Sequence, residues 1–214
     1  MVNDHVERVR TAMLPLCEPL HDVFSWADQL RRERLPEFEG DPNYRWHATH
    51  TVRAFAHLRL DHIRADLGTW RLSGNHARNG ELWLTNGNYR ARVLHALNDH
   101  DVPPPGSNRA RQAFYRNPPL AGRLPLFGEP DDRLLVLWRI NFETAAPCFR
   151  VVRPIGDWNW KWGSHQDVDL NFVLPQTSDE LAGLRFDPTD EDLGLELPPN
   201  DEEEGEEGAG GITG

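Results

Sequence analysis

The segment from Glu81 to Leu97, ELWLTNGNYRARVLHAL, constrains the fold of this chain more strongly than any other part of it. Two runs of β-forming residues flank the dipeptide Asn86-Gly87, which favours a type I′ turn because both central residues of that turn have a positive φ. The spacing therefore predicts a β-hairpin in which Trp83 lies opposite Arg90. Alternation along its strands gives one apolar face, formed by Leu82, Leu84, Tyr89, Ala91 and Val93.

Helical periodicity dominates the chain before this hairpin. Apolar residues recur at helical spacing in residues 4–34, where Pro15 and Pro19 divide the pattern into two predicted helices. The same spacing predicts a third helix over residues 48–65. After the hairpin, Ser107 is a suitable N-cap for one further short helix.

Strand patterns follow the helices rather than alternating with them. They occur at residues 69–72, in the hairpin, at 133–141 and 148–154, and at 168–174. This order predicts an α+β fold, with an N-terminal helical layer packed on an antiparallel β-sheet of about five strands and then a disordered acidic C-terminal tail. The expected parts are a helical N-terminal part (1–67), a sheet part of the same compact unit (68–175), a poorly ordered extension (176–199) and the disordered tail (200–214).

The chain shows no sequence signal for secretion or membrane insertion. No run of 18 apolar residues occurs, and the charged N-terminus lacks the apolar core of a signal peptide. Cys17 and Cys148 are too few for a disulfide framework. We therefore expect a soluble cytoplasmic protein.

Charge is distributed very unevenly along the chain, whose net charge is −11. Residues 41–166 contain 17 basic and 11 acidic residues, a net of +6, and eight of the ten histidines. Residues 167–214 contain 1 basic and 15 acidic residues, a net of −14. A basic middle joined to an acidic tail indicates binding to a polyanion such as RNA or DNA, or an intramolecular mimic of one. A tail that only maintains solubility is the alternative explanation.

The basic face of the hairpin and the segment after it form the first candidate site. Arginine side chains can hold a phosphate backbone, and an exposed tryptophan can stack on a base. The predicted nucleic-acid-binding residues are Trp83, Arg90, Arg92, Arg109, Arg111, Arg116 and Lys161. An ordinary solvated strand face is the alternative.

Metal-independent cleavage of a phosphodiester would be a further use of the same site. His95 would then act as a general base or acid beside Tyr115, while Arg92 stabilises the charge of the transition state. An alternative catalytic set lies in the predicted helix 48–65, where residues four apart share one face. It consists of Arg53, His57 and Asp61. A structural polar face of that helix is the other interpretation.

A tryptophan-rich segment, DWNWKWGSH, is the third candidate. In a strand, its alternating indoles would project from one face and could contact a protein partner. These predicted partner-binding residues are Trp158, Trp160 and Trp162. Packing against the N-terminal helices is the alternative, because tryptophan is mostly buried in proteins.

Several chemical classes lack support in the sequence. No serine-hydrolase elbow, phosphate-binding P-loop or dinucleotide fingerprint occurs, and no zinc-type spacing is present, so we predict no metal and no cofactor. Our leading hypothesis is a nucleic-acid-interacting protein, extended to an RNA-cutting effector of the toxin or defence type. The alternatives are a regulatory or adaptor protein that binds a protein partner, and a small-molecule-binding module. Whether the protein is an enzyme stays open from the sequence alone.

Overall fold

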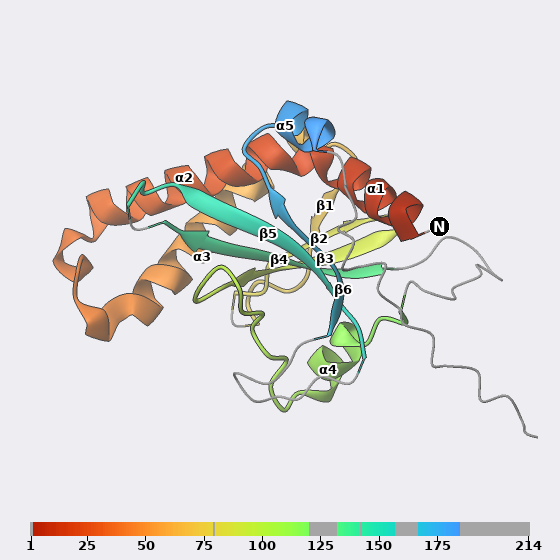
Figure 1. Cartoon of the computed structure of the whole chain (residues 1–214). Helices are drawn as coiled ribbons and strands as arrows, with labels where there is room; N and C mark the ends of the chain where they lie inside the picture. The colour runs from red at the N-terminus through yellow and green to blue at the C-terminus, as the bar shows by residue number, and fades with distance from the viewer. Residues whose placement is uncertain (1, 79, 120–131, 142, 157–166, 185–214) are drawn as a thin grey trace, which may run out of the picture. The chain divides into compact units, whose positions relative to one another are not determined.

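Six strands form one sheet in the computed structural model, which describes residues 2–78, 80–119, 132–141, 143–156 and 167–184 (Figure 1). The strands are β1 (Arg71–Ser73), β2 (Trp83–Asn86), β3 (Tyr89–His95), β4 (Asp132–Ile140), β5 (Pro147–Pro154) and β6 (Val168–Leu174). They lie in chain order across the sheet, and every neighbouring pair is antiparallel except β3 and β4, which are parallel.

The predicted α+β class is confirmed, with helices packed on a mostly antiparallel sheet. The sheet has one strand more than the estimate of about five, and it is mixed because of the β3–β4 pair. Parallel neighbours need a crossover connection rather than a tight turn. The connection between β3 and β4 contains α4 (Arg109–Tyr115), which packs on the sheet.

The remaining helices gather on the opposite side of the sheet from α4 (Figure 1). They are α1 (Val2–Met13), α2 (Cys17–Arg34), α3 (Arg45–His62) and α5 (Ser178–Gly183), with the 3₁₀ helices η1 (Leu14–Leu16), η2 (Pro36–Phe38), η3 (Pro42–Tyr44) and η4 (Arg64–Leu67). Of the two prolines predicted to divide the first helices, only Pro15 lies between them, in η1. Pro19 is the third residue of α2, where its missing N–H breaks no intrahelical hydrogen bond.

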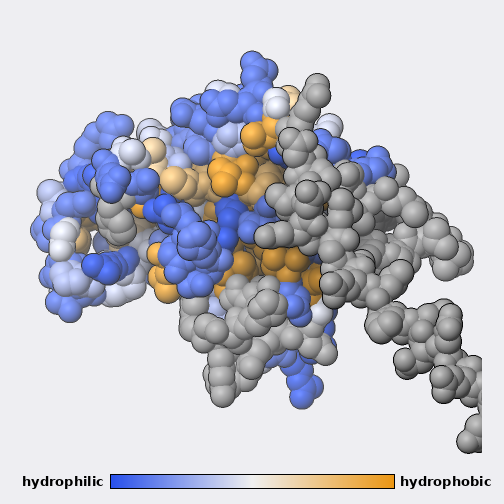
Figure 2. All heavy atoms as spheres, in the orientation of Figure 1, coloured by the Kyte–Doolittle hydropathy of each residue, from blue (hydrophilic) through white to orange (hydrophobic). Residues whose placement is uncertain are grey.

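Both faces of the sheet are covered by apolar side chains. On the face of α1 and α2, the core includes Leu82, Leu84, Ala91, Val93, Leu134, Val136, Trp138, Phe149 and Val151. A smaller core under α4 comprises Ala96, Val102, Phe114, Tyr115, Leu135, Leu137 and Val152. Five consecutive residues of β4, from Leu134 to Trp138, are buried, as predicted for a central strand. Figure 2 shows hydrophobic side chains over the middle of the molecule and mostly hydrophilic ones over the helices at its left.

The β2–β3 hairpin forms, but its predicted register is wrong by two residues. Trp83 lies opposite Arg92 rather than Arg90, and Asn86 lies opposite Tyr89. The turn therefore consists of Gly87 and Asn88, neither of which has a positive φ, so it is not a type I′ turn. The Asn86 carboxamide oxygen accepts hydrogen bonds from the backbone N–H groups of Asn88 and Tyr89, at 3.1 and 3.0 Å. Hydrogen bonds from these two amides to the Asn86 side chain stabilise the observed turn, which the type I′ prediction did not include.

A shift of two residues leaves the predicted faces of the hairpin unchanged, because side chains alternate with a period of two. Leu84 and Ala91 are fully buried in the core under the helices. Arg90 and Arg92 share the other face, since they pair with Thr85 and Trp83.

The N-cap of α4 also differs from the prediction. Asn108, not Ser107, caps this helix, with its side-chain oxygen accepting from the N–H groups of Ala110 and Arg111 at 2.9 and 3.2 Å. An asparagine N-cap satisfies the first free amides of a helix as well as serine does.

The predicted poorly ordered extension begins with α5, whose first residue is held by α2. Glu18 accepts hydrogen bonds from both the N–H and the hydroxyl of Ser178, each at 2.7 Å. Residues from 185 onward, including the predicted tail 200–214, lie outside the described residues. Among the helices of the described chain, none combines the length and apolar composition needed to cross a membrane.

Candidate functional site

Arg92 lies on the sheet face covered by α4. Its guanidinium carbon is 5.4 Å from the centre of the Trp83 ring, in a cation–π arrangement. The edge of that ring contacts Phe114 of α4, with ring centres 4.8 Å apart and planes at 89°. The predicted basic face is therefore not an open sheet surface. Arg92 is half-buried and packs on Trp83, which packs against the core under α4.

Tyr115 is buried beside Arg92 and has a structural partner. Its hydroxyl donates a hydrogen bond to the backbone oxygen of Pro103 at 2.7 Å. Burial raises the pKa of Tyr115 to about 12, against the opposing effect of the charges of Arg92 and Arg111. The hydroxyl therefore stays protonated near neutral pH, and its hydrogen bond holds the connection after β3.

His95 projects from the opposite face of β3. Its ring contacts Trp138, with ring centres 4.8 Å apart. Burial lowers the pKa of His95, and the positive charge of Arg53 lowers it further. The structure thus does not bring the predicted catalytic set together, because Arg92 and Tyr115 lie on one face and His95 on the other.

The charge of Arg53, on α3, acts on residues of both faces of β3. The β2–β3 ladder stops at Trp83 and Arg92, so the last residues of β3 extend beyond β2. The charge of Arg53 lowers the pKa of His95 and also contributes to lowering that of Arg92, after the main effect of burial. Arg53 belongs to one predicted catalytic set, and its charge acts on Arg92 and His95 of the other.

The approach of the chain to Arg53 depends on Gly80. A Cβ atom at this glycine would lie 3.0 Å from the Nε of Arg53, and the φ of Gly80 is +66°. The Nη2 of Arg53 is also 2.8 Å from the Nδ1 of His50, three residues earlier on α3. Burial lowers the pKa of Arg53 itself.

A further arginine contributes to this group from α4. The charge of Arg111 lowers the pKa of Arg92, while the carboxylate of Glu81 acts in the opposite direction. We call Arg53, Arg92 and Arg111 the arginine cluster. Its three members come from α3, β3 and α4, so only the folded chain assembles it.

The other members of the alternative catalytic set have separate partners. The ring of His57 stacks on His76, with ring centres 3.8 Å apart and planes at 20°. Burial lowers the pKa of His57, and His76 lowers it further. Asp61 accepts a hydrogen bond from the Nε of Arg64 at 2.9 Å. Arg53, His57 and Asp61 therefore share a helix face without acting on one common point.

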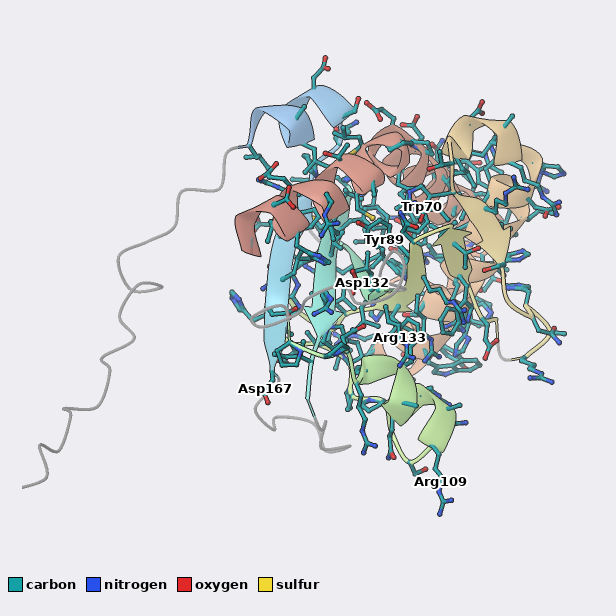
Figure 3. All side chains as sticks on the ribbon, turned by 90° about the vertical axis from the view of Figure 1, so that its right-hand side faces the viewer. Trp70, Tyr89, Arg109, Asp132, Arg133 and Asp167 are labelled. Carbon is teal, nitrogen blue, oxygen red and sulfur yellow. The ribbon has the colours of Figure 1, made fainter. Side chains whose placement is uncertain are left out.

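The remaining predicted arginines lie on exposed surface. Figure 3 shows Arg109 projecting from α4 away from the sheet. Arg90 and Arg116 are also exposed, as is Arg111 of the arginine cluster. The other predicted binding residues, Lys161 and the three tryptophans Trp158, Trp160 and Trp162, lie outside the described residues.

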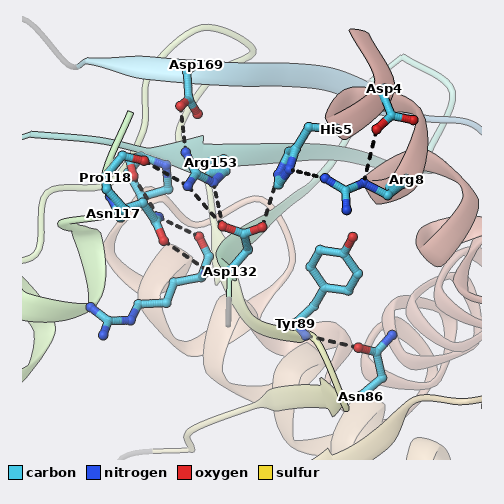
Figure 4. A network of polar contacts seen from close by, with 12 residues as sticks. Asp4, His5, Arg8, Asn86, Tyr89, Asn117, Pro118, Asp132, Arg153 and Asp169 are labelled. Atoms are coloured by element: carbon cyan, nitrogen blue, oxygen red, sulfur yellow. Dashed lines mark hydrogen bonds and ion pairs between the residues drawn. The ribbon is translucent and has the colours of Figure 1, made fainter. Parts of the chain in front are cut away.

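A buried polar network that the sequence did not predict lies near the other end of β3 (Figure 4). Arg153 donates from Nη2 to Asp132 Oδ1 at 2.9 Å and from Nη1 to Asp169 Oδ2 at 2.6 Å. The second carboxylate oxygen of Asp132 is 3.0 Å from the Nε2 of His5 in α1. Burial opposes ionisation of Asp132, but the hydrogen bond from His5 and the charge of Arg153 hold its pKa below the usual value.

This network attaches α1 to the sheet. Asp132 and Arg153 are fully buried, and His5 is 5% exposed. Asn117 extends the network by donating to the backbone oxygens of Arg133 and Pro154, at 2.9 and 2.7 Å. Because its charges are buried and paired, its role is structural. The sequence signal was the presence of charged residues at positions where strand alternation points into the core.

A concave surface of about 820 Å³ lies where α2, α3 and α5 meet. Its lining includes Trp26, which is 36% exposed, with the Arg59 guanidinium 5.7 Å from the centre of its ring. The acidic residues in its lining are Glu18, Asp22, Asp66 and Asp179. This acidic groove has the opposite charge from the arginine cluster.

The described part of the chain holds no group of three or more His, Cys, Asp or Glu side chains arranged to bind a metal ion. Comparison with known proteins adds no assignment: no family model matches the chain, and no curated protein or solved structure is significantly similar to it.

Proposed function

We propose that this protein binds nucleic acid through the arginine cluster. The observation that supports this proposal is the grouping of arginine and aromatic side chains: the Arg92 guanidinium is 5.4 Å from the centre of the Trp83 ring, and the charges of Arg111 and Arg53 act on it. Cationic groups held together in a partly buried place repel one another. A phosphate relieves that repulsion, and arginine can bind it in a bidentate way.

Two further features support a polyanionic ligand. Arg92, a member of the cluster, stacks on Trp83, and further exposed arginines occur on β3 and α4. The segment after Leu184 contains 11 acidic residues and 1 basic residue. Such a segment can compete with nucleic acid for the cluster and tune its affinity.

The test is binding of fluorescein-labelled RNA and DNA to the full chain over a range of salt concentrations. We expect the logarithm of the affinity to fall linearly with the logarithm of salt concentration. Arg53→Gln should weaken binding and reduce that slope by about 1. Arg8→Gln is the matched control, because it removes the same charge from α1, which packs near the other end of β3. Absence of binding at low salt would overturn the proposal.

Cleavage of RNA is a secondary proposal at the same place, favoured by His95 beside Arg53. A histidine whose pKa is lowered is neutral at pH 7 and can accept a proton, while the adjacent guanidinium stabilises negative charge on phosphate. The test is hydrolysis of RNA in the presence of a chelator. Loss of cleavage with retained binding in His95→Gln would support it, and intact RNA after long incubation would exclude it.

Binding of a basic protein segment is the other candidate function, favoured by the acidic groove. The exposed indole of Trp26 and the apolar side chains of Val23 and Ile63 could pack against the aliphatic part of such a segment. Asp22→Asn together with Trp26→Ala should then abolish capture of an arginine-rich peptide. Equal capture by this double variant and the native chain would exclude the groove.

A further inference from the structure

An exposed group of aromatic rings lies at the beginning of α3. We call it the aromatic cluster; its members are Phe38, Tyr44, Trp46, His47 and His50. Trp46 contacts His47 and His50, with ring centres 5.7 and 6.1 Å apart, yet it is 61% exposed. A contiguous group of exposed aromatic side chains, rather than a single one, is typical of a ligand or partner site.

The aromatic cluster is continuous with the arginine cluster. Trp46, His50 and Arg53 are separated by four and three residues, so they lie along one face of α3 over about 10 Å. His50 joins the two clusters, because its Nδ1 is 2.8 Å from the Nη2 of Arg53. The aromatic cluster is therefore in direct contact with Arg53 of the arginine cluster.

The electrostatic state of His50 suits stacking. Burial lowers the pKa of His50, and the charges of Arg53 and His47 lower it further, so the ring is neutral at pH 7. A neutral imidazole presents an aromatic face without a full charge. The first part of this surface is thus aromatic and uncharged, and the second part is cationic.

We infer that the bound nucleic acid is single-stranded, with its bases stacked on the aromatic cluster and its phosphates on the arginine cluster. This inference rests on the proposed nucleic-acid binding. Proteins that hold single strands combine a positive surface with aromatic side chains on which successive bases stack. In a duplex the base faces are already stacked and cannot reach Trp46, so a duplex gains only the phosphate contacts.

The test compares three labelled ligands of one sequence, namely single-stranded RNA, single-stranded DNA and a DNA duplex, each titrated with the full chain. The native chain should bind the single strands more tightly than the duplex. Trp46→Ala should weaken single-strand binding by roughly tenfold and leave duplex binding unchanged. Trp46→Phe should restore most of the loss, because it keeps an aromatic face. A difference between the RNA and DNA arms would identify which single strand is preferred.

Leu58→Ala is the matched control, since Leu58 is 51% exposed on another side of the same helix. Circular dichroism of each variant checks that α3 is intact. Equal binding of single strands and duplex, or a Trp46→Ala variant with native affinity, would overturn the inference while the proposed function stands. Failure of the native chain to bind any of the three ligands would overturn both.

Discussion

Arg153 and Asp132 form an ion pair at 2.9 Å in which both side chains are fully buried between α1 and the sheet. Removal of one partner leaves the other charged and buried, which costs far more than the loss of a surface ion pair. The same guanidinium also donates to Asp169 and to the backbone oxygen of Pro118. One arginine therefore joins β4, β5, β6 and the end of the crossover connection.

Replacement of this arginine should strongly destabilise the fold. We expect Arg153→Met to lower the free energy of unfolding by about 3–5 kcal/mol, because Asp132 loses its cation. Urea denaturation followed by circular dichroism measures the effect. Asp99→Asn, which breaks the exposed pair with Arg139, should cause a much smaller change. The Arg153→Met, Asp132→Asn double variant should be more stable than Arg153→Met alone, and a further loss of stability would contradict this explanation.

Stability should decrease as the pH falls below about 6.5, the ordinary value for histidine. Burial lowers the pKa values of His50, His57 and His95 in the folded state. Between the lowered folded-state pKa values and 6.5, the unfolded chain binds more protons than the folded one, so acidification favours unfolding. Thermal unfolding midpoints at pH 7.5, 6.5 and 5.5 measure this effect. A His57→Gln, His95→Gln variant should show a shallower dependence, and an unchanged slope would assign the effect to other groups.

Nucleic-acid affinity should have the opposite dependence on pH. A bound phosphate favours the protonated form of His95, so binding is accompanied by proton uptake near neutral pH. Affinity at constant ionic strength should therefore rise when the pH is lowered from 7.5 to 6.5. Calorimetry in buffers with different ionisation enthalpies measures the protons taken up. No uptake would show that His95 does not contact the bound phosphates.

Gly74 should be intolerant of a side chain. Its φ is +91°, and an added Cβ would lie 2.5 Å from the Cδ1 of Trp83. We expect Gly74→Ala to cost at least roughly 1–2 kcal/mol of stability from the backbone conformation alone, and to displace the indole that holds Arg92. Gly87→Ala is the matched control, because that position has no neighbour within 4 Å and no positive φ. Similar melting temperatures for the two variants would contradict the prediction.

Removal of the acidic C-terminal segment should strengthen binding. Residues 185–214 carry 11 acidic residues and 1 basic residue, a net charge of −10. A chain ending at Leu184 should bind RNA or DNA more tightly than the full chain at low salt, and the difference should shrink as salt screens the charges. Titrations of both chains at 50 and 200 mM salt measure this. Equal affinities at both concentrations would show that the segment does not compete for the arginine cluster.

Local sequence patterns correctly predicted which hairpin residues face the core. Strand alternation placed Leu84 and Ala91 correctly in the core, because a face assignment depends only on odd or even position. The same reasoning gave the wrong hairpin register, because the Asn86 side chain hydrogen-bonds two turn amides and moves the turn to Gly87-Asn88. The parallel β3–β4 pair was not predictable in this way, since its partners are separated by a long crossover.

In the candidate site, too, the residue types could be predicted from local patterns, but the tertiary arrangement of the residues could not. Sequence reasoning selected Arg53, Arg92 and His95 from their residue types and local spacing, but it put them in two separate sets. Their convergence depends on how α3 lies against the end of β3, which no local pattern encodes. Trp46 was not selected, although its position at helical spacing before His50 and Arg53 was visible in the sequence. The Asp132–Arg153 pair was missed because a buried charge can be interpreted only when its partner is known.

The parallel pairing of β3 with β4 also determines how the chain can fold during synthesis. The ribosome releases β1, β2 and β3 long before β4, which occupies the middle of the sheet and contacts both β3 and β5. Until β4 emerges, a nascent chain presents one side of β3 without its hydrogen-bonding partner, and such edges recruit other strands. Because the strands lie in chain order, the sheet is completed from β1 toward β6, and the interval before β4 arrives is one in which the free edge of β3 is open to pairing with other chains.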